Sequence, residues 1–233
     1  MPERIESMTI PDQPIMVHQT PVVLVGGGVV DRDQLVLFAR QYPVIAVDSG
    51  AVVLADMGLE PEAVVGDFDS VHGLSLDHIP LQIKITDQYS TDFEKALAVI
   101  KAPKIFGFGF LGKRLDHSLA ALHVMAGSDH SDIVLIDPFD IAIMVKGQFD
   151  AQLPQGSRIS LYAMMPQRFL ASKGLVYPLD GLDIGIGQTL ATSNQVVIPA
   201  DEQAGDIAVS ITPEGEHPYL LMIAPEGLNA VIG

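Results

Sequence analysis

The sequence predicts an α/β fold in two parts, an N-terminal domain with a parallel sheet and a smaller C-terminal all-β sandwich. Short apolar runs alternate with helical patterns up to about residue 147, and only strand-like runs follow. Hydrophobic residues make up 48% of the chain and charged residues 18%, so a sizeable core can be buried. We expect an N-terminal extension over 1–20, a first domain over 21–147 and a second over 148–233.

The first domain shows a regular succession of strand and helix patterns. Strands are expected where short apolar runs are bounded by Gly, Pro or Asp, at 21–28, 43–50, 62–70, 81–87, 104–110 and 132–137. Helices are expected where apolar residues recur at helical spacing, at 31–41, 51–58, 90–102 and 114–127. The apolar–polar alternation of 81–87 favours a position nearer the sheet edge. Strands that alternate with helices in this way form parallel sheets covered by helices.

The second domain contains short apolar runs that Gly and Pro interrupt at intervals of about ten residues. They read "SRISLYAMM", "QTLATSNQVVIPA", "DIAVSITP" and "PYLLMIAP". Such spacing is typical of a small antiparallel sandwich or barrel.

Composition excludes several classes of function. The net charge is −16, from 29 acidic and 13 basic residues, which argues against binding to nucleic acid. The chain has no cysteine, so disulfides, thiolate metal sites and a cysteine nucleophile are excluded. Residues 1–20 lack the apolar core of a signal peptide, and no apolar run is long enough to span a membrane. We therefore expect a cytoplasmic protein without a membrane partner.

Acidic residues follow several of the predicted strands. Asp48 follows the second strand, Asp67 and Asp69 follow the third, and Asp92 opens the helix after the fourth. Ligands of open parallel sheets bind outside the carboxyl ends of the strands, so these four acids should face one crevice. Carboxylates gathered there repel one another unless a cation neutralises them, and Mg²⁺ prefers oxygen ligands. The sequence therefore predicts a magnesium site at this edge.

Phosphate-binding features are expected at the same edge. The glycines of "VGGG" (25–28) and of 107–112 let backbone approach phosphate oxygens, and the helix that starts near Ser90 offers free N–H groups. Lys95 and Arg114 supply positive charge. Together with the acids, these features favour phosphoryl-type transfer.

Each feature alone has a simpler interpretation. An Asp at a strand end is commonly a turn or cap residue, and Lys95 could pair with Asp92 on the helix surface. "VGGG" has neither dinucleotide-site nor P-loop spacing, and His117 could be a satisfied histidine with no catalytic part. Only their joint occurrence at one edge favours the metal–phosphate site.

The run Gly66-Asp67-Phe68-Asp69-Ser70 also predicts a local geometry. If the segment is extended, side chains alternate, so Asp67 and Asp69 point together into the crevice while Phe68 turns back to the core.

Three blocks of the chain strongly resemble those of the thiamine pyrophosphokinase family. They are "VDSGAVVLADMGLEPEAVVGDFDSV", "TDQYSTDFEKAL" and "GFLGKRLDHSLAAL", and "GLVYPL" and "ATSNQ" follow in the family's order. The resemblance covers roughly residues 22–225. It implies a Rossmann-like ATP-binding domain, a C-terminal β-sandwich and a homodimer with active sites between subunits. The implied reaction moves the pyrophosphoryl group of ATP to the hydroxyl of thiamine and releases AMP, with Mg²⁺ as cofactor.

The resemblance also assigns roles to residues. The implied metal ligands are Asp48, Asp67, Asp69 and Asp92. The implied catalytic residues are Asp67, Asp69, Asp92 and Arg114. The implied ATP contacts are Gly27, Asp48, Ser49, Gln88, Ser90, Thr91, Lys95, Arg114, Asp116 and His117. The implied thiamine contacts are Tyr177, Ser193 and Asn194.

Three positions depart from the family pattern. Val52 stands where many members have asparagine, Gln195 where an acid is frequent, and Lys113 where a glycine precedes the arginine. None of them removes an implied metal ligand. Two other functions remain open from the sequence: a related pyrophosphokinase acting on a hydroxymethyl-pterin, and a non-catalytic nucleotide or metal sensor.

Overall fold

The computed structural model describes residues 2–71, 73–128, 132–200 and 205–232. The chain forms two compact units, Met1–Pro138 and Phe139–Gly233. The boundary expected between residues 147 and 148 lies within the second unit, between two of its strands.

The first unit alternates strands and helices in the order that the sequence predicts. Its strands are β1 (Glu3–Ser7), β2 (Met16–Val17), β3 (Val22–Val25), β4 (Val44–Val47), β5 (Ala63–Gly66), β6 (Leu81–Ile85), β7 (Ile100–Lys101), β8 (Ile105–Phe108) and β9 (Ile133–Ile136). Its helices are α1 (Arg32–Ala39), α2 (Gly50–Met57), α3 (Asp92–Val99) and α4 (Leu115–Gly127). The six strands and four helices expected over 21–137 are thereby confirmed. All of them except α2, which is as long as expected but begins one residue earlier, are shorter than the segments that predicted them.

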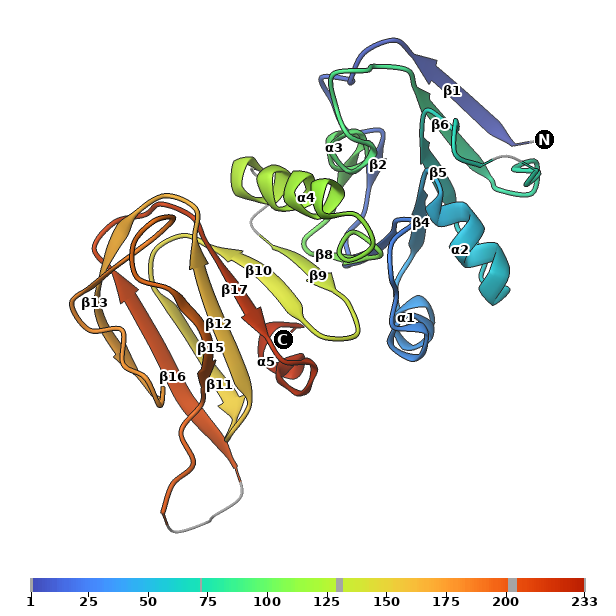
Figure 1. Cartoon of the computed structure of the whole chain (residues 1–233). Coiled ribbons are helices and arrows are strands. Elements are labelled where there is room, and N and C mark those ends of the chain that lie inside the picture. Colours follow the sequence, from blue (N-terminus) through green and yellow to red (C-terminus); the bar gives the residue numbers. More distant parts are fainter. Residues whose placement is uncertain (1, 72, 129–131, 201–204, 233) are drawn as a thin grey trace. The chain divides into compact units, whose positions relative to one another are not determined.

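Parallel pairing orders the strands of this unit as β1-β6-β5-β4-β3-β8-β9. Strands β3, β4, β5 and β8 are buried along their whole length, as expected for parallel strands covered on both faces. Figure 1 shows α2 and α3 on opposite sides of β4 and β5. The edge position belongs to β1, from the expected N-terminal extension, and β6 lies one place further in.

The second unit consists mainly of antiparallel strands. They are β10 (Ile141–Val145), β11 (Phe149–Pro154), β12 (Arg158–Ala163), β13 (Gln167–Lys173), β14 (Leu182–Ile184), β15 (Ala191–Gln195), β16 (Asp206–Pro213) and β17 (Tyr219–Ile223). A 3-10 turn, η1 (Pro225–Gly227), and the short helix α5 (Asn229–Ile232) follow. Strands β11, β16, β13 and β14 form a four-stranded sheet, and the core between it and β12 and β17 contains Phe149, Phe169 and Tyr219.

The predicted fold class is wrong. A Rossmann-like parallel-sheet domain followed by a small β-sandwich is not what forms, because the structure contains a large mixed sheet. Within the second unit, β10, β17, β12 and β15 pair antiparallel in that order. Strand accounts for 37% of the described residues and helix for 20%, so this part of the chain is mostly β. Strand β17 shows why the pattern misleads: its run Tyr219–Leu221 is continuously buried, as in the centre of a sheet, where a sandwich strand would alternate.

Candidate functional site

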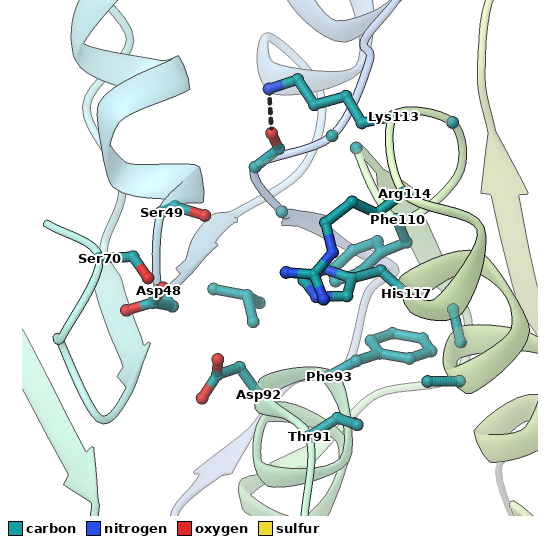
Figure 2. Close-up of a pocket in the computed structure, with 18 residues that line it drawn as sticks. Asp48, Ser49, Ser70, Thr91, Asp92, Phe93, Phe110, Lys113, Arg114 and His117 are labelled. Atoms are coloured by element: carbon teal, nitrogen blue, oxygen red, sulfur yellow. Dashed lines mark hydrogen bonds between the residues drawn. The ribbon is translucent and has the colours of Figure 1, made fainter.

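A pocket of about 390 Å³ lies within the first unit, at the loops that follow β3, β4 and β8 and at the starts of α3 and α4 (Figure 2). It includes seven of the residues that the sequence assigned to a nucleotide or metal site: Gly27, Asp48, Ser49, Thr91, Asp92, Arg114 and His117. Its other lining residues are Gly26, Gly28, Val47, Ser70, Phe93, Gly109, Phe110, Gly112, Lys113, Ala120 and Ala121. The strand-end crevice expected from the parallel topology therefore exists.

Glycines bring two loops of this pocket into backbone contact. The N–H of Gly28 donates to the carbonyl of Gly109 at 2.7 Å, and a Cβ on Gly28 would lie 2.5 Å from that same oxygen. Gly109 itself has φ +74°, a conformation that glycine adopts without strain. Any side chain at either position would push the loops apart, so this wall of the pocket is made of bare backbone.

The start of α2 is held just as closely to β3. A Cβ on Gly50 would lie 1.7 Å from the carbonyl oxygen of Val25, and a Cβ on Gly27 would lie 2.1 Å from Ser49 Oγ. Ser49 is the N-cap residue of α2 but makes no side-chain cap hydrogen bond. Its hydroxyl is therefore directed to the pocket that it lines, as Figure 2 shows.

Three carboxylates meet beside the pocket. Asp48, Asp67 and Asp92 each offer an oxygen that lies within 4.8 Å of the other two. Asp48 is only 5% exposed and its backbone has φ +44°. Its Oδ1 is buried and has no hydrogen-bond partner among the residues that the structure describes. A buried carboxylate oxygen without a partner is costly, which indicates that a ligand of this oxygen completes the site.

Lys95 supplies the positive charge next to these acids. Its Nζ lies 2.9 Å from Asp92 Oδ1 and 3.5 Å from Asp67 Oδ2, and its side chain is 2% exposed. Burial lowers the pKa of Lys95, but the hydrogen bond and charge of Asp92, with those of Asp67, raise it more, so the net shift is upward. Burial raises the pKa of Asp92, as do the charges of Asp67 and Asp48, against the opposing effect of Lys95. Lys95 therefore contacts Asp92, as the simpler interpretation expected, but the lysine is buried beside the carboxylates and does not lie on the helix surface.

The extended geometry expected for Asp67-Phe68-Asp69 is wrong. Phe68 has φ +68° and is half-buried, and the N–H of Asp69 donates to Asp67 Oδ1 at 3.1 Å. The aspartate side chain therefore closes a turn on its own backbone, as Asp commonly does, and alternation ends at Gly66. Asp67 joins the carboxylate group, whereas Asp69 is exposed and lies outside it.

Several polar groups of the loop before α3 form hydrogen bonds within the loop and with the first turn of the helix. Thr91 and Glu94 form a capping box, in which Thr91 Oγ1 accepts from the Glu94 N–H at 3.2 Å and Glu94 Oε2 accepts from the Thr91 N–H at 3.1 Å. Ser90 Oγ donates to Asp87, and the amide of exposed Gln88 donates to the carbonyl of Thr86 at 3.3 Å. Of these positions, Thr91 lines the pocket, whereas Gln88 and Ser90 do not.

The loop before α4 contributes exposed charges. Arg114 Nε donates to Asp116 Oδ1 at 3.1 Å, and this pairing raises the pKa of Arg114 and lowers that of Asp116. Arg114 and His117 line the pocket, whereas Asp116 does not. Lys113 has φ +52°, and its Nζ donates to the carbonyl of Gly27 at 2.6 Å.

Several side chains of this pocket were not predicted from the sequence, among them two aromatic rings and one hydroxyl. The rings of Phe93 and Phe110 lie 4.4 Å apart and form its apolar part. Phe93 is one of the apolar residues at helical spacing in the helix expected at 90–102, and nothing in this local pattern distinguishes a core face from a pocket wall. Ser70 follows the acidic turn and also lines the pocket. Its position directly after the acidic run "DFD" is the feature of the sequence that could have indicated this.

The residues assigned to thiamine belong to the second unit. Asn194 is 6% exposed, and its amide group is used internally: Oδ1 accepts from the N–H of Tyr177 at 3.1 Å and of Gln195 at 2.8 Å, and Nδ2 donates to the carbonyl of Tyr177 at 2.7 Å. The Tyr177 side chain is exposed. Ser193 has φ +59°, and its N–H donates to Ser160 Oγ at 2.9 Å.

Comparison with known proteins identifies the family. Residues 36–136 match the family model described as thiamin pyrophosphokinase, catalytic domain. A relative named thiamine pyrophosphokinase, from Bacillus subtilis (strain 168), is 30% identical over an alignment of 166 residues that covers 66% of this chain and 78% of the relative. The chain belongs to the thiamine pyrophosphokinase family. The predicted family and the enzyme class, an ATP-dependent pyrophosphotransferase, are confirmed, and neither alternative function gains support.

Solved structures of thiamine pyrophosphokinases share the fold. The Bacillus subtilis structure aligns with a TM-score of 0.70 at 23% identity and covers 88% of this chain and 99% of its own. The Candida albicans structure aligns with a TM-score of 0.72 at 15% identity and covers 93% of this chain and 94% of its own. The family match spans the three carboxylates, Lys95 and the pocket residues from Val47 to Ala121, whereas the pocket residues Gly26, Gly27 and Gly28 precede the matched segment. Among the described residues, no helix has the length and apolar character needed to cross a membrane.

Proposed function

We propose that the chain uses ATP and Mg²⁺ to transfer a pyrophosphoryl group to the hydroxyl of thiamine, giving thiamine diphosphate and AMP. The observation that carries the proposal is the carboxylate group of Asp48, Asp67 and Asp92 beside a glycine-walled pocket, in a member of this family. Transfer of this kind needs acids for a divalent ion, cations for phosphate oxygens and backbone that permits close approach.

The residues present fit a magnesium ion. Oxygen ligands suit Mg²⁺, and the buried Oδ1 of Asp48, which has no hydrogen-bond partner among the described residues, is an acceptor that a cation would satisfy. Three carboxyl groups gather here, and the ammonium of Lys95 contacts two of them, so the group can balance the charge of a divalent cation as well. Asp48, Asp67 and Asp92 would hold the ion, and Asp69 extends this set if the exposed turn closes on the nucleotide. A bound magnesium ion would neutralise phosphate oxygens during the transfer.

The chain's own residues would bind and orient the triphosphate. The backbone of Gly27 and the start of α3 just after Thr91, whose own N–H donates to Glu94, would present N–H groups to anionic oxygens. Arg114 and Lys95 would stabilise the negative charge that develops as AMP leaves. Ser49 and His117 line the same pocket and are proposed contacts of the nucleotide, as are Gln88 and Ser90 of the loop before α3 and Asp116 of the first turn of α4.

The acceptor side of the proposal comes from the family. Tyr177 would place its ring against the cationic thiazolium, with Ser193 and Asn194 nearby, and cation–π attraction contributes about 0.5–2 kcal/mol. Exposure of the Tyr177 ring supports a contact role for it. One carboxylate, Asp92 or Asp69, would accept the proton of the thiamine hydroxyl, although a loose transition state needs little base assistance. We further propose a homodimer and a cytoplasmic location.

A product assay tests the reaction. The purified protein is incubated with ATP, Mg²⁺ and either thiamine or a hydroxymethyl-pterin, and AMP and the diphosphorylated product are quantified. AMP together with thiamine diphosphate supports the proposal. AMP formed only with the pterin overturns the acceptor, and ATP binding without AMP overturns the activity.

A metal titration tests the carboxylate site separately. Asp48→Asn keeps the size and tolerates the positive φ, but removes a charge. We expect Mg²⁺ at about a hundredfold over its dissociation constant to stabilise the original protein by about 2.7 kcal/mol. The variant should respond much less, whereas Asp56→Asn, an exposed acid of α2, should respond as the original protein does. An undiminished response in Asp48→Asn would exclude Asp48 as a ligand.

A further inference from the structure

Lys113 joins the two loops that form one rim of the pocket. Its Nζ donates to the carbonyl oxygen of Gly27 at 2.6 Å, and both residues line the pocket. Figure 2 shows the Lys113 and Arg114 side chains leaving the loop in different directions, the first toward the Gly26–Gly28 loop and the second toward His117 and Phe110. The neighbouring side chains of Lys113 and Arg114 therefore interact with different groups.

The backbone around Lys113 is one that glycine usually provides. Gly112 and Lys113 have φ of +75° and +52°, two successive residues in the left-handed region. A lysine there is disfavoured relative to glycine, so its presence calls for a compensating contact. The hydrogen bond to Gly27 is such a contact, and a glycine could not make it.

The bond to Gly27 closes a loop that is already anchored at its other end. The N–H of Gly28 donates to the carbonyl of Gly109 at 2.7 Å, which fixes the beginning of the 109–114 segment. Lys113 fixes the end of this segment, one residue before Arg114. The segment is therefore held to the Gly26–Gly28 loop at both ends.

Arg114 depends on this backbone for its position. It is the N-cap residue of α4 and makes no side-chain cap bond, and its side chain is 66% exposed. Its ion pair with Asp116, the second residue of α4, joins two exposed side chains, and such a surface pair restrains the guanidinium little. The direction in which Arg114 enters the pocket is consequently set by the backbone that Lys113 holds.

We propose that Lys113 is a positioning residue for Arg114. By binding the carbonyl of Gly27, its ammonium holds the 109–114 loop against the Gly26–Gly28 loop and keeps the guanidinium over the pocket, where it meets an anionic phosphate group. The inference rests on the proposed function for the identity of that anion. Lys113 itself does not touch the nucleotide.

A thermodynamic cycle on nucleotide affinity tests this role. Titration calorimetry measures ATP binding, without acceptor, to the original protein, Lys113→Gly, Lys113→Met, Arg114→Met and the double variant Lys113→Met/Arg114→Met. Lys113→Gly keeps the left-handed backbone without strain and removes only the tether, so its melting temperature should stay close to the original. Lys113→Arg can still donate to Gly27, and Lys146→Met removes an exposed lysine of the second unit as a charge control.

We expect the effects of the Lys113 and Arg114 substitutions on ATP affinity to be strongly non-additive. Lys113→Met and Lys113→Gly should each weaken ATP binding about tenfold, a coupling typical of residues within one network. Arg114→Met should weaken it about thirtyfold through loss of charge-assisted hydrogen bonds, and the double variant should be no worse than Arg114→Met. Lys113→Arg and Lys146→Met should remain within about twofold of the original protein, because neither loses the tether.

Two outcomes would overturn the inference. If the losses of ATP affinity caused by Lys113→Met and Arg114→Met multiply in the double variant, Lys113 contacts the nucleotide itself. Unchanged affinity in Lys113→Gly and Lys113→Met would mean that the tether does not position Arg114. A protein that binds ATP with the expected cycle but forms no thiamine diphosphate would contradict the proposed function and still support the role of Lys113.

Discussion

Lys95 and Asp92 form an ion pair within the first turn of α3, with Nζ 2.9 Å from Oδ1 and the lysine side chain 2% exposed. Because Asp67 lies 3.5 Å from the same ammonium, Lys95 is the shared counter-ion of two acids. The pair therefore links the electrostatics of the carboxylate group to the fold of the helix that supplies Asp92.

Replacing Lys95 by methionine should destabilise the protein and increase its dependence on magnesium. Without the ammonium, two partly buried carboxylates lose their counter-charge, and we expect a loss of about 2 kcal/mol in magnesium-free buffer. Added Mg²⁺ should restore more stability to the variant than to the original protein, because the cation replaces the missing charge. Chemical denaturation with and without Mg²⁺ measures both effects. The control is Lys101→Met, at an exposed position of β7; equal stability of the two variants would contradict the argument.

The acids of this site could be predicted because parallel topology places strand ends together. Asp48, Asp67 and Asp92 come from three segments, yet all meet at the edge where the strands end. Asp69 could not be placed by the same argument, because the hydrogen bond from its N–H to Asp67 turns the chain after one residue. A period-two pattern holds only while the backbone stays extended, and a side chain that bonds its own backbone ends it.

The sheet of the second unit could not be read from the sequence for a different reason. Strand β17 pairs with β10 and β12, which precede it by more than fifty residues, and such pairings leave no local periodicity. The continuous burial of Tyr219–Leu221 shows a central strand only once its neighbours are known. Lys113 is a third case, since its contact with Gly27 joins loops that are far apart in the chain.

Gly50→Ala should destabilise the first unit severely. The new Cβ would lie 1.7 Å from the carbonyl oxygen of Val25, a backbone atom of a buried strand, so β3 and α2 must separate. We expect a loss of more than about 3 kcal/mol, or failure to fold.

Gly127→Ala is the matched control, because nothing lies within 4 Å of its Cβ and its φ is not positive. Alanine at the end of α4 should be neutral or stabilise by up to about 1 kcal/mol. Thermal unfolding of both variants measures the contrast, and similar melting temperatures would refute it.

Asn194→Ala should destabilise the segment that contains Tyr177. The amide of Asn194 makes three hydrogen bonds to backbone groups, and its removal leaves buried groups unsatisfied at a cost of about 2 kcal/mol. Asn194→Asp keeps the acceptor for two N–H groups but loses the donor to the Tyr177 carbonyl, so it should be intermediate. Gln188→Ala, at an exposed position, is the control. Urea denaturation gives the order, and an Asn194→Ala variant as stable as the control would show that these bonds contribute nothing.

Tyr219→Phe should lower stability in a way that depends on pH. The buried hydroxyl donates to the carbonyl of Gly147 at 2.9 Å, and its loss should cost about 1 kcal/mol at neutral pH. Burial, and then the charge of Asp150, raises the pKa of Tyr219 above its usual range. A raised pKa in the folded state means that protonated Tyr219 stabilises the fold fully below the unfolded-state value of about 10, and that this contribution is lost as the pH rises further.

The stability of the original protein should therefore fall more steeply above about pH 10 than that of Tyr219→Phe. Tyr89→Phe, which alters a fully exposed ring, should follow the original protein at every pH. Urea midpoints of the three proteins across this range decide the matter: parallel curves for the original protein and Tyr219→Phe would mean that the buried hydroxyl does not resist ionisation.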